Sequence, residues 1–451
     1  MRGLIRHAAV VAGATVVVGT APGAAGAGGP AQAASRYPYT LVDPGTFGGP
    51  QNYLNLPAVP LTPNGMLLGS ADTTTPDASY PNVNPFTIEF PDGNLAHAFE
   101  WQNGHLGDLG ALPGNNSSAV FEVNGSGVGV GASETTVTDP YTGWPAEHAT
   151  MFTGGKVTDL GTLPAGYESQ ANDINDRGQV SGFASNGTPD PYSFFSWGTQ
   201  ARSFIWHNGV MRDIGTLGGP DAVSTTLNAR GQITGQSYTN ATANPATGVP
   251  TLDPFLWQNG HMRDLGTLGG TFAMANWINS PGDVVGFSLT ADQAFRGFLW
   301  RHGTMTDLPP VGGAPWAFAN ALNDRGQVVG NARDTQFNEL IAVLWAGGRG
   351  YDLNTLVAPN PLQMVTAEYI NNQGDIVGGG VLPNGDRRIF LLIRNPSVPL
   401  PQTRAPLRPL PATGLPDRSA SVILAIHATR HGGIAAGIRQ LRHAAAMRIR
   451  P

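Results

Sequence analysis

Short hydrophobic stretches, each bounded by turn residues, recur along residues 39–394. Four representative stretches, here called strand types a, b, c and d, are Ala367–Ile370, Asp375–Val377, Phe298–Trp300 and Met305–Leu308. Asn-Asp-Arg-Gly and similar turns separate types a and b, and Arg-His-Gly or Gln-Asn-Gly separates types c and d. Short apolar runs joined by such turns are typical of β-hairpins. The pattern therefore predicts two hairpins, and so four short strands, in each unit.

The unit occurs seven times, and each copy has an aspartate in the same register. These aspartates are Asp43, Asp108, Asp159, Asp213, Asp264, Asp307 and Asp352, separated by 65, 51, 54, 51, 43 and 45 residues. In the best copies the aspartate begins the sequence Asp-Leu-Gly-Thr-Leu-Gly-Gly, an aromatic run such as Phe298–Trp300 precedes it, and Asn-x-x-Gly follows it. Four strands in a repeat of this length are typical of a β-propeller blade.

The two ends of the repeat region complement each other. The region opens with a lone type d strand, Tyr39–Val42, and closes with types a, b and c but no type d. A ring closes if the first strand completes the last blade, which leaves no open sheet edge. We therefore predict an all-β fold, a seven-bladed β-propeller of four-stranded blades over residues 37–394, closed by its N-terminal strand.

Residues that recur in every unit are expected to have structural roles. Tryptophans in one register, such as Trp206 and Trp257, are predicted to pack between blades, and the register aspartate is predicted to accept hydrogen bonds from turn amides. A residue that a site needs once has no reason to appear seven times.

The complete pattern resembles the HAF repeat family of bacterial extracellular proteins. The signature of that family begins with His-Ala-Phe, which this chain has at His97–Phe99, and His148-Ala149 is a partial second copy. The resemblance covers roughly residues 39–394. It implies a repeat protein that is secreted or located at the cell surface, and it assigns no catalytic residue. The histidine is not expected to be a required ligand, because most other copies have a different residue there.

Composition agrees with a strand-rich extracellular protein. The chain has 61 Gly, 37 Pro and no Cys, which disfavours a helical enzyme and excludes disulfides, zinc–thiolate sites and cysteine nucleophiles. Residues 37–394 contain 14 Lys and Arg against 30 Asp and Glu, whereas residues 395–451 contain eight Arg and one Asp. An acidic body repels phosphates, so we do not expect nucleic-acid binding.

The N-terminal residues have the pattern of a secretion signal. Residues 1–33 are predicted to be a signal peptide cleaved after Ala33, because Arg2 and Arg6 precede a short apolar run that ends in small residues. A membrane anchor is the alternative, but this run is shorter than the ~20 apolar residues that a span needs, so no span is expected in the mature chain.

Residues 395–451 form a Pro-rich linker and a basic tail, predicted to be disordered. Within this tail, Leu410, Pro411, Ala412, Thr413 and Gly414 resemble the sortase recognition pentapeptide of wall-anchored proteins. The sequence favours a flexible basic tail with a chance match over wall anchoring, because charged residues interrupt the apolar span that should follow.

Long connections between strand types b and c form the predicted ligand-binding face. They are Ala71–Leu95, Ser133–Glu147, Ala184–Ala201 and Ser237–Thr251. Aromatic rings on such loops suit sugar or protein recognition, because flat rings bury area with little loss of entropy. The candidate binding residues are Tyr80, Tyr141, Trp144, Tyr192, Trp197 and Tyr238. The alternative is that these rings hold their own loops in place.

The same loops carry acidic residues that an enzyme could use as an acid–base pair: Asp72, Asp77, Asp92, Asp139, Asp190 and Asp253. Asp173, Asn175 and Asp176 resemble half of a calcium loop, but other units form this turn without the first aspartate. We therefore expect no metal and no cofactor, and no catalytic residue can be assigned.

The sequence predicts a secreted, extracellular and monomeric binding or adhesion module without enzymatic activity. Its expected partner is an extracellular glycan or a surface protein, and attachment to the cell wall depends on the pentapeptide. Two alternatives stay open: a carbohydrate-active hydrolase or lyase with carboxylates on the same loops, and a structural component of a surface layer.

Overall fold

The computed structural model describes residues 36–42, 66–84, 93–102, 105–114, 116–245, 248–292, 294–334, 339–385 and 387–402. These residues form β-strands and one 3-10 turn, η1 (Leu353–Thr355), which confirms the all-β prediction for this part of the chain. None of them belongs to a helix with the length and hydrophobicity needed to span a bilayer. The predicted signal peptide and the Leu410–Gly414 pentapeptide lie outside the described residues.

Four sheets have four antiparallel strands each, three of them built from strands that follow one another in the chain. The first contains β5 (Ser118–Val123), β6 (Gly129–Thr138), β7 (Pro145–Thr153) and β8 (Lys156–Gly161). The second contains β9 (Ser169–Ile174), β10 (Val180–Pro189), β11 (Thr199–His207) and β12 (Val210–Asp213). The third contains β21 (Trp316–Leu322), β22 (Val328–Arg333), β23 (Glu339–Ala346) and β24 (Arg349–Asp352).

The fourth of these sheets joins the two ends of the repeat region. It contains β25 (Gln363–Ile370), β26 (Ile376–Val381), β27 (Arg387–Arg394) and, at its edge, β1 (Tyr39–Val42). Tyr39 pairs with Arg394 and Val42 with Leu391 in antiparallel register. The predicted completion of the last sheet by the N-terminal strand is therefore confirmed.

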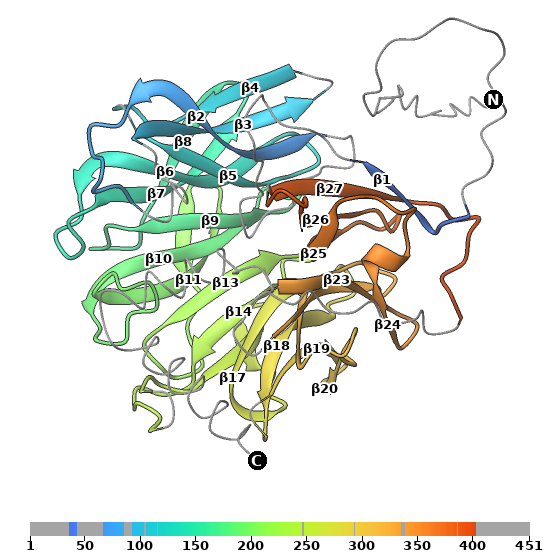
Figure 1. Ribbon diagram of the computed structural model, residues 1–451. Helices are drawn as coiled ribbons and strands as arrows, with labels where there is room; N and C mark the ends of the chain where they lie inside the picture. The colour runs from blue at the N-terminus through green and yellow to red at the C-terminus, as the bar shows by residue number, and fades with distance from the viewer. Residues whose placement is uncertain are drawn as a thin grey trace, which may run out of the picture.

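The remaining strands form one larger and one smaller sheet. The larger, of eight strands, contains β13 (Ala222–Leu227), β14 (Ile233–Tyr238), β15 (Leu252–Gln258), β16 (His261–Asp264), β17 (Gly269–Ile278), β18 (Val284–Thr290), β19 (Phe295–Arg301) and β20 (Thr304–Asp307). The smaller, of three strands, contains β2 (Leu67–Pro76), β3 (Asn94–Gln102) and β4 (His105–Gly110). The sheets follow one another around a common centre, as in a β-propeller (Figure 1). The pairing yields six sheets in the described residues and so does not support the predicted count of seven blades.

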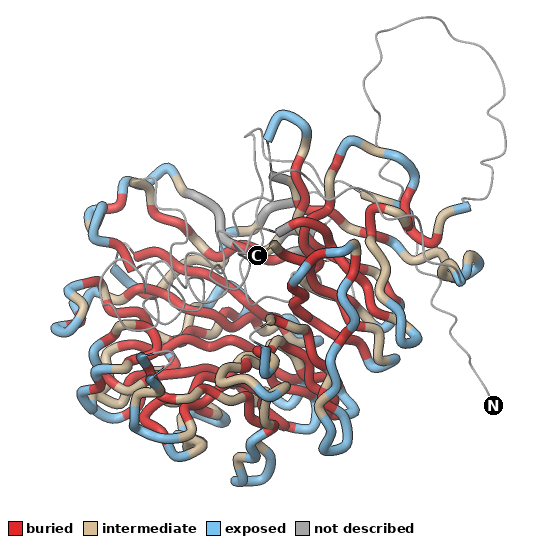
Figure 2. Tube along the Cα trace, turned by 60° about the horizontal axis from the view of Figure 1, so that its bottom comes forward, coloured by how far each residue is buried: buried red, intermediate tan, exposed pale blue. Residues whose placement is uncertain are grey.

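Apolar side chains fill the space between neighbouring sheets. One core cluster joins Tyr39, Leu344 and Phe390, and another joins Val130, Ala171 and Phe204 from adjacent sheets. Buried residues run along the strands, while exposed residues gather at the turns (Figure 2). Trp345, which is 3% exposed, donates its Nε1–H to the carbonyl of Pro309, 2.9 Å away in the preceding unit. This contact agrees with the predicted packing role of the register tryptophans.

A β-bulge interrupts the innermost strand of six units at the same register. In the pairing of this strand with the next one, a single residue has no partner opposite it. This residue is Asn172, Thr225, Asn276 or Asn320 in four of the units, and two further units have the same bulge. Each of these four side chains donates to a carbonyl on the innermost strand of the next unit, for example Asn276 Nδ2 to Ala319 O at 2.8 Å. The bulge thus supplies a side chain that links neighbouring sheets near the centre.

The asparagine of each Asn-x-x-Gly turn forms a second chain of links between units. Asn228 Oδ1 accepts from the backbone amides of Arg230 and Gln232, both at 3.0 Å, which holds its own turn. Its Nδ2 donates to the carbonyl of Asn279 in the next unit at 3.0 Å. The same donation joins Asn124 to Asn175, Asn175 to Asn228, Asn279 to Asn323 and Asn323 to Asn371. Repetition of this residue is therefore explained by packing between units.

Candidate functional site

Three of the long connections begin with the same local structure. The backbone amides of Asp77, Asp139 and Asp190 donate to carbonyls at the far ends of their loops, at 2.9–3.0 Å. Each aspartate also accepts, through Oδ1, a hydrogen bond from the backbone amide two residues later, at 2.7–3.0 Å. This is an Asx turn, which short acidic side chains favour. Three of the six loop aspartates that an enzyme could have used therefore close loops.

Two of these aspartates form buried pairs with a carboxyl at the start of the next unit. Asp139 hydrogen-bonds to Glu168, and Asp190 hydrogen-bonds to Asp221, with all four residues at most 7% exposed. Two carboxyls can hydrogen-bond only if one of them keeps a proton. Burial and the adjacent carboxyls raise the pKa of Glu168 and of Asp221 well above the usual range of such groups.

Glu168 and Asp221 also accept hydrogen bonds from the loops of the preceding units. Asp221 accepts from the amides of Phe194 at 2.6 Å and Ala201 at 2.9 Å. Glu168 accepts from the amide of Glu147 at 2.9 Å and from the side chain of Asn84 at 3.2 Å. Each carboxyl therefore fastens the loop of one unit to the first strand of the next.

The first two loops are also joined to each other directly. Asn82 Nδ2 donates to the carbonyl of Gly143 at 2.6 Å, and Asn84 Nδ2 donates to the carbonyl of Pro145 at 3.0 Å. Glu134 accepts from the backbone amide of Asn84 at 3.1 Å. These contacts hold residues 77–84 against residues 139–145, and thus fix the side chains that project from both.

Tyrosines project from this loop junction. Tyr80 and Tyr141 are each 50% exposed, and they lie two residues from Asn82 and Gly143, the residues that join the loops. The ring of Tyr167 meets that of Tyr141 edge-on, with centroids 6.4 Å apart. Tyr192, partly exposed, occupies in the third loop the place of Tyr141 in the second. We call Tyr80, Tyr141, Tyr167 and Tyr192 the tyrosine platform.

The other predicted binding residues do not reach the surface. Trp144 is 6% exposed, and Trp197 and Tyr238 are fully buried. Trp197 packs against the rings of Phe183 and Phe195, which join one core cluster under the third loop. These three rings therefore hold the loops in place, as the alternative interpretation stated, and are not available to a ligand.

Tyr167 is a platform residue that sequence reasoning missed. It lies in the connection between β8 and β9, whereas the predicted binding residues all lie in connections between strand types b and c. Both kinds of connection lie on the same face of antiparallel sheets, so strand topology was the signal that could have found it. Its position directly before Glu168 places it beside the Asp139–Glu168 pair.

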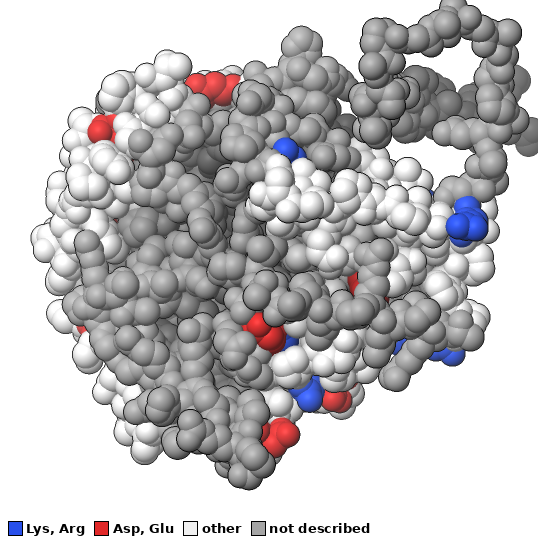
Figure 3. Space-filling view, in the orientation of Figure 1, with Lys and Arg blue, Asp and Glu red and all other residues white. Residues whose placement is uncertain are grey.

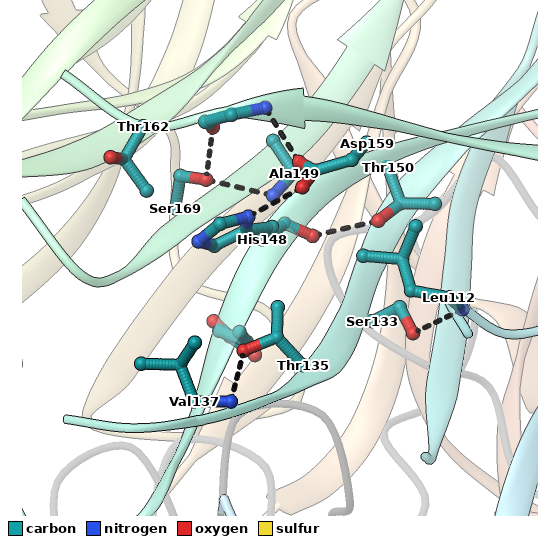
Figure 4. Close-up of polar contacts among 12 residues, drawn as sticks. Leu112, Ser133, Thr135, Val137, His148, Ala149, Thr150, Asp159, Thr162 and Ser169 are labelled. Atoms are coloured by element: carbon teal, nitrogen blue, oxygen red, sulfur yellow. Dashed lines mark hydrogen bonds and ion pairs between the residues drawn. The ribbon is translucent and has the colours of Figure 1, made fainter. Parts of the chain in front are cut away.

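The His-Ala-Phe motif has a structural role. His148 Nδ1 lies 2.8 Å from the carboxylate of Asp159, whose Oδ1 accepts from the amide of Gly161 at 2.7 Å (Figure 4). The hydroxyl of Ser169 in the next unit accepts from the amide of Ala149 at 2.8 Å and donates to the carbonyl of Gly161 at 2.7 Å. His97 and Asp108 repeat this arrangement. The predicted role of the register aspartate is therefore confirmed, also at Asp213 and Asp264.

One unit replaces the basic partner of the register aspartate with an acid. Where three other units place His97, His148 or Arg202 against the register aspartate, this one places Asp253 against Asp264. Burial, followed by the charge of Asp264 and a hydrogen bond with it, raises the pKa of Asp253 to about 6. Asp253 therefore takes part in a carboxyl pair on the outer strands. The side chains of Asp72 and Asp92 lie outside the described residues.

The half calcium loop does not assemble around a common point. Asp173 accepts from the amide of Leu227 in the next unit at 2.7 Å, and Asp176 accepts from the amide of Gly125 in the preceding unit at 2.7 Å. Asn175 accepts a hydrogen bond from the amide of Arg177 within its own turn. Across the described ranges, no three His, Asp or Glu side chains are grouped so that they could hold a metal ion.

Replacing Asp190 with asparagine is expected to stabilise the protein at alkaline pH. The pKa of Asp221 is higher in the folded protein than in the unfolded chain, so the proton on Asp221 stabilises the fold. This stabilisation is fully present below the pKa of the unfolded chain and is lost as the pH rises through the pKa of the folded protein. An amide at position 190 would donate to ionised Asp221 without needing the proton. We expect a gain of about 1–3 kcal/mol in the free energy of unfolding at pH 8.5, measured by urea denaturation.

At pH 4.5, where the shared proton is retained, the same variant should change the free energy of unfolding little. Asp190→Ala is the control, because it removes both the hydrogen bond to Asp221 and the acceptor for the Tyr192 amide. It should destabilise the protein at both pH values. Equal stability of wild type and Asp190→Asn at pH 8.5 would contradict the shared proton.

The sheet order defines the class of this protein, a β-propeller with four-stranded units. No protein-family model matches the chain, and no curated protein matches it. Among solved structures, it is similar to a puromycin-hydrolysing peptidase from Mycobacterium tuberculosis, with a TM-score of 0.45 and 11% identity over 72% of this chain and 50% of that chain. The chain therefore spans half the length of that peptidase.

Two further solved structures are similar at the same level of identity. TolB from Acinetobacter baumannii gives a TM-score of 0.36 and 11% identity over 72% of this chain and 63% of that chain. The Aleuria aurantia lectin in complex with Fucalpha1-6GlcNAc gives a TM-score of 0.29 and 11% identity over 65% of this chain and 95% of that chain. At such identities the likeness concerns the fold alone.

Proposed function

We propose that this chain is an extracellular binding module that holds a glycan on its tyrosine platform. The observation that carries the proposal is the exposure of Tyr80 and Tyr141, each 50%, on two loops that Asn82 and Gly143 join. Rings on fastened loops lose little entropy on binding, and their flat faces match the apolar faces of sugars. Burial of Asp77, Asp139 and Asp190 in structural hydrogen bonds favours binding over hydrolysis.

The proposed location rests on the sequence. The signal peptide over residues 1–33 and the likeness to HAF repeats support secretion, and the Leu410–Gly414 pentapeptide supports attachment to the cell wall. A monomer is part of the same proposal, because β1 covers the edge of the last sheet and so occupies a place where a second chain could pair.

The proposed ring has seven units. The eight-stranded sheet divides into β13–β16 and β17–β20, which are joined by one parallel pair, Leu252 with Phe272. Each half repeats the strand order of the four-stranded sheets. The three-stranded sheet of β2, β3 and β4 would then be the first unit.

The proposed function is tested by incubating the protein with insoluble wall, chitin and cellulose fractions. We expect at least one fraction to deplete the protein from solution without releasing soluble sugar. Tyr141→Ala should weaken that binding about tenfold, since truncation of an anchoring ring costs about 1–2 kcal/mol. Released sugar would instead favour the hydrolase or lyase alternative.

A matched control is Val210→Ala. Val210 is 48% exposed on β12, the outer strand of its sheet. Its replacement by alanine therefore removes exposed apolar area without changing the platform. It should bind like the wild type. If no fraction depletes the protein, or if both variants bind equally well, glycan binding at the platform is wrong.

A further inference from the structure

The turns between strand types a and b and between types c and d lie at one end of the antiparallel strands, opposite the loops of the tyrosine platform. We call this end of the ring the turn face. Five of its turns between types c and d contain no acidic residue: 153–156, 207–210, 258–261, 301–304 and 346–349. The basic side chains in these turns are Lys156, His207, His261, Arg301, His302 and Arg349. This outer part of the turn face therefore has basic groups and no carboxylate of its own.

Exposed arginines also occupy other parts of the turn face. They are Arg177, Arg230, Arg263 and Arg325. Nη2 of Arg230 lies so close to Gly282 of the next unit that an added Cβ there would be 2.8 Å away. Arg263 approaches Gly303 of the next unit in the same way, at 3.3 Å. The guanidinium groups therefore extend from one unit toward the next across the turn face.

Most of these cations have no anionic partner within the described residues. Arg301 is the exception, with Nη2 2.6 Å from the carboxylate of Asp283. In the part of the chain that the structure describes, the turn-face residues without an ion pair are Lys156, Arg177, Arg230, Arg263, Arg325 and Arg349. The exposed acids of the same turns already accept hydrogen bonds, Asp176 from the amide of Gly125 at 2.7 Å and Asp324 from the amide of Ser280 at 2.8 Å. The turn face is therefore open to an external anion.

Residues 395–402, the start of the C-terminal segment, lie against the same face. Leu400 packs against the core cluster of the last two sheets, and Arg349 Nη1 donates to the carbonyl of Gln402 at 2.6 Å (Figure 1). The position of Arg349, directly after the turn between β23 and β24, places Gln402 at the turn face. Residues 403–451 contain eight Arg and one Asp. This basic sequence therefore continues from the turn face and not from the platform.

We propose that the turn face and the arginines of residues 403–451 together bind a linear anionic polysaccharide. This surface is separate from the tyrosine platform, so the proposal goes beyond the proposed function. A guanidinium can hold a carboxylate through two parallel hydrogen bonds, and it keeps its own charge at any physiological pH. In Figure 3, basic side chains are visible at separate places around β1, β20 and β24 and are not gathered in one patch. Cations spread over successive units favour an extended polymer over a small anion.

The charge of the rest of the ring favours a polysaccharide over nucleic acid. Residues 37–394 contain 30 Asp and Glu against 14 Lys and Arg, which repels a polymer with the charge density of DNA. A chain of uronic acids has a single carboxylate per sugar, so the repulsion is weaker while several guanidinium contacts are kept. A polymer held at the turn face leaves the tyrosine platform pointing away from it.

The test measures binding of fluorescently labelled polygalacturonate to the full chain by anisotropy. We expect binding in about 0.05 M salt, and a Kd about tenfold higher in about 0.3 M salt, because salt screens exposed charges. Dextran, a neutral polymer, should not bind.

Two exposed valines provide a matched pair of charge substitutions. Val210, 48% exposed, begins β12 directly after its turn, and Val137, 49% exposed, lies near the platform end of β6. Val210→Glu places a negative charge on the turn face and should raise the Kd for polygalacturonate about fivefold. Val137→Glu adds the same charge at the opposite end and should change the Kd less than about twofold.

Removal of positive charge separates the ring from the C-terminal segment. Arg177→Gln together with Arg230→Gln should raise the Kd about fivefold, and Arg442→Gln, Arg448→Gln and Arg450→Gln together should have a similar effect. Tyr141→Ala should leave the Kd for polygalacturonate unchanged, because its ring is on the other face.

The remaining outcomes contradict the proposal. No binding, binding that ignores salt, or equal effects of Val210→Glu and Val137→Glu would exclude the turn face as the site. An effect of the C-terminal substitutions alone would exclude it as well. Tighter binding of duplex DNA than of polygalacturonate, at equal concentration of anionic groups, would show that the partner class is wrong. None of these outcomes bears on the platform, which is tested with the uncharged polymers chitin and cellulose.

Discussion

Gly378→Ala is expected to lower the free energy of unfolding by more than about 3 kcal/mol. A Cβ on Gly378 would overlap the backbone carbonyl of Thr366 on the neighbouring strand and would also meet the ring of Phe390. The backbone cannot move aside without breaking the pairing of β25 with β26. Denaturant unfolding followed by tryptophan fluorescence measures the loss.

Gly379→Ala is the matched control at the next position. Its Cβ would contact only Cγ2 of the Thr366 side chain, at 3.3 Å, and neither glycine has a positive φ. Alanine there should change the free energy of unfolding by less than about 1 kcal/mol. Equal effects of the two substitutions would show that close approach of the carbonyl is not what requires glycine.

The requirement extends to the other units. An added Cβ would overlap a backbone carbonyl of the neighbouring strand in the same way at Gly131, Gly182, Gly235, Gly286 and Gly330. All of these lie opposite a β-bulge, where the extra residue brings the carbonyl over the glycine. The glycine that ends the type b strand in these six units is therefore fixed by backbone geometry.

Removing β1 is expected to abolish the single cooperative unfolding transition. Tyr39 is 1% exposed in the core of the last sheet, and truncation of a ring of this size alone costs about 3–5 kcal/mol. The deletion also removes the pairing with β27 and the hydrogen bond from the Asn395 amide to the carbonyl of Pro38, at 2.9 Å. The exposed edge of β27 should promote association between chains.

Differential scanning calorimetry and size-exclusion chromatography on a chain without residues 37–42 check this expectation. A chain that lacks only residues 1–34 is the control, because it keeps every contact of β1. Both this chain and the full chain should unfold in one transition. An unchanged melting curve after removal of β1 would show that the last sheet is stable without it.

The sequence predicted those features that local chemistry determines. Turn residues and the repeat register placed the hairpins, and the unmatched Tyr39–Val42 strand predicted its pairing with the last sheet. The role of Asp159 and its equivalents followed from the preference of aspartate for accepting turn amides. These predictions needed no knowledge of how neighbouring units meet.

Features that depend on how neighbouring units pack could not be predicted from the sequence. Whether a loop ring is exposed like Tyr141 or buried like Trp197 depends on how the adjacent sheet covers it, and no local pattern records that. The carboxyl pair of Asp190 and Asp221 joins residues on different units. The predicted count of seven blades was not supported, because the Leu252–Phe272 pair joins two units into one sheet.

Closure by β1 has a consequence for the timing of folding. Strand β1 leaves the ribosome before the other described strands, whereas its partner β27 is the last of them, with 344 residues between Val42 and Arg387. At about 5–20 residues per second, synthesis of that stretch takes roughly 17–70 s. For this interval the first strand has no partner, and a nascent chain that stops early can never complete the ring. The pairing of β1 therefore depends on a strand that is synthesised long after it.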